Sequence, residues 1–163
     1  MFEDHLLRKL IDLSPDKDFT GFNVFDFIYS EGSPLEAITY SMLFWPDFVE
    51  IDGMVFLKWT FENQADFNRL QQALLKYGGD RQKTEESFNF FDVSSLFGRR
   101  IGDTTDEEDS WLLERLAQMW HFRLHQLFPE RTFSVQVLSA EQSGDEAGLV
   151  FFQQVGDKAV LSK

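Results

Sequence analysis

The chain has 163 residues and no cysteine, 43% of it is hydrophobic, and 28 acidic against 15 basic side chains give a formal net charge of −13. This length predicts a single domain, residues 1–163, with a core of its own, while the missing thiols exclude disulfide scaffolds, thiol nucleophiles and iron–sulfur clusters. The charge repels phosphate backbones and anionic lipids, so we expect binding neither to nucleic acid nor to membranes, and it favours a basic protein partner.

The first part of the chain predicts short helices. Residues 2–13 carry apolar side chains at helical spacing and are expected to form a helix that stops before Pro15. Residues 22–29 are ambiguous, because their aromatic and β-branched content suits a strand. Asn23 followed by Asp26 resembles a helix cap with an acid in the first turn, which favours a short helix.

A clearer helix start follows at Ser33. Ser33 can cap a helix, Pro34 suits the first helical position, and Glu36 completes a capping box. This helix is expected to run to about Phe44, because Pro46 disfavours helical geometry in the residue before it.

The strongest hairpin signal covers residues 47–61. Asp52 and Gly53 form a preferred two-residue type I′ turn between two apolar runs. Both faces of the hairpin are largely apolar, so we expect helices or a second subunit to cover both sides. The predicted partners across the hairpin are Ile51 and Met54, Glu50 and Val55, Val49 and Phe56, Phe48 and Leu57, and Asp47 and Lys58.

Asn63 predicts the start of the next helix, over residues 63–77, which ends at Gly78 and Gly79. Residues 80–87 are polar, and we expect them to form a loop.

The longest helix is predicted over residues 105–128. Its start carries a capping box, formed either by Thr104 with Glu107 or by Thr105 with Glu108.

A second hairpin is predicted over residues 131–155. A turn centred on Ser143 and Gly144 would set Val137 opposite Val150. Because both hairpins are local, the sequence predicts an α+β fold with a mostly antiparallel sheet, built from the two hairpins and packed with four to five helices.

The start of the long helix is the main candidate for a binding surface. Four consecutive acidic residues lie there. The helix dipole stabilises them, and they would also suit the docking of a basic partner. Two large rings fall on the polar side of the same helix, where they indicate either a packed neighbouring element or an aromatic anchor for a partner. The candidate partner-binding residues are Asp106, Glu107, Glu108, Asp109, Trp111 and Phe122.

His121 and His125 are weaker candidates for a metal site. They lie four residues apart on one helix face and could share a metal ion. The glutamate of the zinc-protease motif is missing, since Phe122 follows His121, and no third ligand is evident. We therefore expect no metal and no other cofactor. With Glu114, the two histidines form the polar face that a small enzyme or a ligand-binding domain would use.

The leading functional hypothesis is a non-enzymatic, cytoplasmic protein-binding domain. The chain contains neither a Gly-x-Ser-x-Gly elbow nor a glycine-rich phosphate loop, and its charged N-terminus differs from a secretory signal. Its composition is similar to that of bacterial immunity proteins, which neutralise basic toxins, and a regulatory protein would share it too; no motif supports this analogy. The alternatives are the small enzyme or ligand-binding domain and a structural subunit of a homo-oligomer whose acidity serves only solubility.

Overall fold

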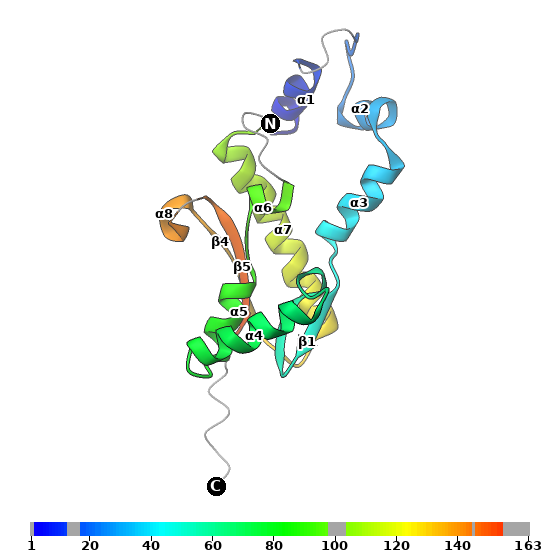
Figure 1. Ribbon diagram of the computed structural model, residues 1–163. Coiled ribbons are helices and arrows are strands. Elements are labelled where there is room, and N and C mark those ends of the chain that lie inside the picture. Colours follow the sequence, from blue (N-terminus) through cyan, green and yellow to red (C-terminus); the bar gives the residue numbers. More distant parts are fainter. Residues whose placement is uncertain (1, 13–16, 98–103, 145, 155–163) are drawn as a thin grey trace. The chain divides into compact units, whose positions relative to one another are not determined.

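The protein has an α+β fold, as the sequence predicted (Figure 1). The computed structural model describes residues 2–12, 17–97, 104–144 and 146–154. The chain divides into two compact units, Met1–Ser41 and Met42–Lys163. The single-domain organisation over residues 1–163 stays a prediction.

The first unit is helical. Its elements are α1 (Phe2–Asp12), α2 (Val24–Glu31) and the greater part of α3 (Pro34–Phe44). The preference for a helix after Asn23 is confirmed, because Asn23 and Asp26 cap each other's backbone N–H groups at 3.0 Å. The Ser33 hydroxyl accepts a hydrogen bond from the Glu36 N–H at 3.4 Å, and α3 ends at Phe44 as predicted. The predicted stop of α1 before Pro15 lies outside the described residues.

A small aromatic core holds this first unit. Phe19 is buried, and its ring centroid lies 5.4 Å from that of Phe22 and 5.2 Å from that of Phe27. Helix α2 contributes to this core through Phe27 on its inward side.

The second unit contains two antiparallel sheets. The elements that follow α3 are β1 (Phe48–Ile51), β2 (Met54–Leu57), the 3-10 helix η1 (Lys58–Thr60), α4 (Gln64–Lys76), α5 (Arg81–Phe88), β3 (Phe90–Asp92), α6 (Val93–Phe97), α7 (Asp106–Leu127), β4 (Phe133–Leu138), α8 (Ala140–Ser143) and β5 (Gly148–Gln153). One sheet pairs β1 with β2, and the other has the strand order β3–β5–β4. The described residues form eight α-helices rather than four to five, because α5, α6 and α8 are too short to show a helical apolar period.

The first hairpin has the register that its sequence predicts. Ile51 pairs with Met54, and the pairing continues residue by residue to Phe48 and Leu57. Asp52 and Gly53 have positive φ angles of 51° and 79°, as a type I′ turn requires. The predicted pair of Asp47 and Lys58 forms an ion pair at 3.8 Å.

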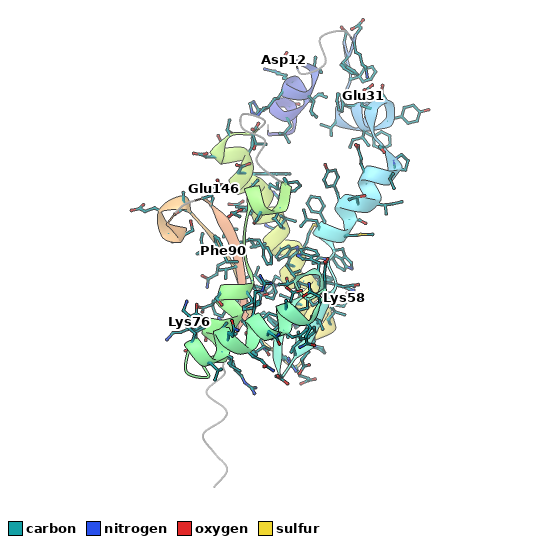
Figure 2. The ribbon with its side chains drawn as sticks, viewed as in Figure 1. Asp12, Glu31, Lys58, Lys76, Phe90 and Glu146 are labelled. Atoms are coloured by element: carbon teal, nitrogen blue, oxygen red, sulfur yellow. The ribbon has the colours of Figure 1, made fainter. Side chains whose placement is uncertain are left out.

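Strand β2 is buried on both of its faces, which confirms the expected two-sided cover. Val55 and Leu57 belong to a cluster that includes Trp120 of α7. The alternate residues Met54 and Phe56 point to the other side, into a second cluster with Leu70 of α4. Figure 2 shows the resulting crowding of side chains around α4, α7 and this hairpin. The cover therefore comes from elements of the same chain.

Trp120 is the centre of the larger cluster. It is fully buried, and its ring Nε1–H donates a hydrogen bond to the Leu43 carbonyl at 2.8 Å, so its polar atom is satisfied. Rings from four other elements meet it edge-on, with centroids 5.9 Å away for Phe91, 6.0 Å for Phe151, 6.3 Å for Trp59 and 6.5 Å for Phe48.

Residues 80–87 were expected to form a loop, which is wrong: they lie in α5 and its cap. Asp80 begins the helix by accepting a hydrogen bond from the Lys83 N–H at 3.0 Å. This hydrogen bond lowers the pKa of Asp80, so the cap stays ionised near neutral pH and is lost only when acid protonates it. The polar pattern of this segment resembles a solvated loop because it hides a buried acid, Glu85.

Glu85 and Asn89 bind backbone groups of both sheets. The Glu85 carboxylate, 1% exposed, accepts hydrogen bonds from the Val55 N–H at 2.6 Å, the Gln153 N–H at 2.7 Å and the Gln153 side-chain amide at 2.6 Å. The Asn89 side-chain NH₂ donates to the Val55 carbonyl at 2.9 Å, and the Asn89 backbone carbonyl accepts from the Phe151 N–H at 3.4 Å. Glu85 and Asn89 thus link β2 to β5 through hydrogen bonds to the backbone of both strands.

The second hairpin differs from its prediction by one residue in register. Val137 pairs with Leu149, not with Val150. The residues of β5 are a continuous apolar run, so alternation cannot select one register over its neighbour. The connection decides it instead: Ser139 caps the short α8, and Gly144 ends it with a positive φ angle of 89°.

We predict that Gly53→Val destabilises the protein by about 2 kcal/mol or more, because a β-branched residue resists a positive φ angle. A side chain at this position also meets the Arg81 guanidinium, since a Cβ would lie 2.9 Å from its Nη1. Gly53→Asn is the control, because asparagine tolerates this conformation. Urea unfolding measures both, and equal midpoints for the valine variant and the unmodified protein would contradict the turn.

We predict that Glu85→Gln lowers the free energy of unfolding by about 2–3 kcal/mol, because its new NH₂ group would face buried donors. Glu86→Gln, one residue along the same helix, should change it by about 0.5 kcal/mol or less, because Glu86 is only half-buried and accepts from Gln82. Urea unfolding of both variants gives the comparison, and similar losses in the two would refute the role of Glu85.

Candidate functional site

The four acids at the start of α7 differ in their exposure and in their hydrogen bonds. The choice between the two predicted capping boxes falls on Thr105 and Glu108: the Glu108 carboxylate accepts from the Thr105 N–H at 2.7 Å. Glu108 is only 5% exposed, so it serves the cap and does not lie on a docking surface. Asp109 is half-buried, and its Oδ1 atom has no hydrogen-bond partner within the described part of the chain. Asp106 and Glu107 are exposed.

The two predicted rings share one face of α7 but do not touch. Eleven residues separate Trp111 from Phe122, which is about three turns and about 16 Å along the helix axis. Trp111 is half-buried, and the Arg115 guanidinium lies 5.0 Å from its ring centroid. Arg115 in turn donates to the Gln118 side chain at 3.2 Å, so the polar residues between the rings are ordered. The structure therefore brings Trp111 close to the acids and leaves Phe122 at a separate place.

Phe122 forms a surface pair with Trp45, a residue that the sequence marked only as the end of a helix. Their ring centroids lie 5.8 Å apart, and the side chains are 61% and 39% exposed. Trp45 could not be paired with Phe122 from the sequence, because no periodicity relates two residues 77 positions apart.

A chain of charged side chains begins at the Trp45 ring of this pair. The Arg123 guanidinium lies 5.4 Å from the Trp45 ring centroid and 3.7 Å from the Asp47 carboxylate. Asp47 also pairs with Lys58, so the rim of the ring pair is a short chain of opposite charges. An aromatic centre with a polar rim is the arrangement found in protein interfaces.

The two histidines line a pocket at the other end of α7. The pocket has a volume of about 310 Å³, and its lining residues are His121, His125, Pro129, Glu130, Arg131, Thr132 and Phe133. Glu114, predicted to act with the histidines, is not part of the lining and lies about two turns from His121 along the helix.

Arg131 is the only arginine of that lining, and it is held by other parts of the chain. Its guanidinium forms an ion pair with Glu50 at 2.7 Å and donates to the Gln153 side chain at 3.3 Å. The pocket therefore offers two exposed imidazoles and an arginine whose charge is already paired, which suits weak binding of a small polar molecule.

Neither a metal cluster nor a membrane span is found in the described part of the chain. No three histidine, aspartate or glutamate side chains of residues 2–12, 17–97, 104–144 and 146–154 gather closely enough to hold a metal ion. None of the helices in these ranges has both the length and the apolar character needed to cross a bilayer.

Comparisons of the chain with protein-family models, with curated proteins and with solved structures give no match. The site's own geometry is therefore the basis for inferring a function.

We predict that the purified protein holds no stoichiometric zinc, because His121 and His125 have no third ligand among the described residues, and a stable zinc site needs at least three. Elemental analysis after dialysis against zinc checks this. About one zinc per chain, lost in His125→Ala, would contradict the prediction and favour the ligand-binding alternative.

Proposed function

We propose that this protein is a cytoplasmic, non-enzymatic binding domain that recognises a basic protein partner through the exposed face of α7. The observation that carries the proposal is the ring pair of Trp45 and Phe122, which is 39% and 61% exposed. Rings that lie together at a surface are typical of binding sites, because a partner that covers them removes a large apolar area from water. An immunity-type protein and a regulatory protein would both use such a surface.

The acidic start of α7 supplies the electrostatic part of this surface. Glu107 precedes Phe122 by fifteen residues, or about 22 Å along the helix. An ordinary interface buries about 800 Å² on each partner, and a patch of this size is wide enough to include both Glu107 and Phe122. Asp106 and Glu107 would then lie at the rim and attract basic side chains during approach, while the rings provide most of the affinity.

The pocket beside His121 and His125 supports a second candidate function, in which the protein binds a small polar ligand or catalyses a reaction of that ligand. This candidate is weaker, because Arg131 is committed to Glu50 and the predicted Glu114 lies elsewhere. A homo-oligomer is a third candidate, but each added copy brings a further net charge of −13, which opposes self-association.

The test is affinity capture from the source-cell lysate on the immobilised full chain. The unmodified protein should capture a basic protein, and Phe122→Ala should lose it. Leu75→Ala is the matched control, because Leu75 is a large apolar side chain, 81% exposed, that belongs to α4 and not to the proposed surface. With the captured protein purified, Phe122→Ala should raise Kd about 30-fold, mainly through faster dissociation.

Charge reversal separates steering from contact. Asp106→Lys combined with Glu107→Lys should slow association and flatten its dependence on salt, with a smaller effect on dissociation. Capture of no basic protein, or equal capture by the Phe122→Ala variant, would overturn the proposed function.

A further inference from the structure

The outward face of α2 is apolar and exposed. Phe25, Ile28 and Tyr29 are 74%, 58% and 86% exposed, and their spacing places them on one side of the helix. Phe27 packs inward on Phe19, so the burial that holds α2 in place uses the opposite side. The outward rings are therefore not needed for the core of this unit.

Helix α3 continues this pattern. Leu35 and Ile38 are 73% and 57% exposed, one turn apart, and none of the α3 residues is buried. Figure 2 shows side chains projecting away from the α2 and α3 ribbons. A helix that is apolar on most of its sides is normally covered, and an exposed set of this size marks an interaction surface.

The charge of this segment restricts what can cover it. From Asp18 to Leu57 the sequence contains no lysine, arginine or histidine. The acids within α2 and α3 are Asp26, Glu31 and Glu36. A hydrogen bond from Lys17 lowers the pKa of Glu31, and the Thr20 hydroxyl lowers that of Asp18, so both stay ionised near neutral pH. Glu31 is already ion-paired with Lys17, so the exposed Glu36 is the main acid that these helices offer to a partner.

We infer that α2 and α3 form a second docking surface, which binds a cationic amphipathic segment of a partner protein. The apolar side of such a segment covers the exposed rings and aliphatic side chains, and its lysines or arginines meet Glu36 and the neighbouring acids. A second copy of this chain would bring acid against acid, and an anionic membrane would be repelled for the same reason. The inference rests on the proposed protein-binding function but uses helices other than α7.

The experiment uses the full chain and a synthetic 18-residue peptide of lysine and leucine, patterned as an amphipathic helix and labelled for fluorescence anisotropy. The unmodified protein should bind this peptide, more weakly as salt is raised, and should not bind an analogue with glutamine in place of each lysine. Tyr29→Ser combined with Leu35→Ser should weaken binding about tenfold or more. Leu75→Ser is the matched control and should bind as the unmodified protein does; far-UV circular dichroism checks that all variants are folded.

Several outcomes would overturn the inference. If the glutamine analogue bound as tightly as the lysine peptide, the charge of the peptide would have no role in binding. Weaker binding in Phe122→Ala, with none lost in the α2–α3 variant, would move the peptide to α7 and leave the proposed function intact. No binding by the unmodified protein or any variant would overturn the inference alone, because the capture experiment tests the proposed function separately. A dimer in sedimentation that the α2–α3 variant dissociates would identify a second copy as the occupant, and co-sedimentation with anionic vesicles would identify a membrane. Protection of Tyr29 from oxidative footprinting in the monomeric, peptide-free protein would show that the chain itself covers this surface.

Discussion

The carboxylate of Glu85 joins two strands that belong to different sheets, and the arrangement of the second unit depends on it. Val55 of β2 and Gln153 of β5 direct their backbone N–H groups at this one side chain. Burying an ionised carboxylate is costly, and the cost is offset only if its oxygens are hydrogen-bonded. Here three N–H donors meet it, and Asn89 satisfies the Val55 carbonyl beside them. With β2 held in this way, its side chains can fill one apolar cluster on each of its faces.

The features that the sequence predicted correctly are those decided by residues close together in the chain. The turn at Asp52 and Gly53 determined a register without reference to any other element, and the caps at Asn23, Asn63 and Thr105 each need only a residue three positions on. Glu85 shows why α5 was mistaken for a loop. Its partners lie 30 and 68 positions away, so nothing nearby distinguishes the buried Glu85 from the half-buried Glu86 that follows it.

The candidate site was predictable to the same extent. Trp111 and Phe122 could be assigned to one helix face, because both belong to α7 and the period of a helix relates them. Trp45 contacts Phe122 only through the tertiary fold. Glu108 is drawn into the cap because Thr105, and not Thr104, is the capping residue of α7. Local patterns thus identified the helix face, whereas the tertiary fold determined which rings meet on it.

The net negative charge of this chain counteracts the tendency of its exposed aromatic rings to self-associate. Four of the nineteen phenylalanines, namely Phe19, Phe56, Phe133 and Phe151, are buried in the described residues, so the rings exceed what the two units enclose. Exposed rings on α2 and α7 would favour self-association through the hydrophobic effect. A net charge of −13 opposes that association between like copies but not with a basic protein. The same charge therefore opposes contact between the exposed rings of like copies, and under the proposed function it leaves these rings open to a basic partner.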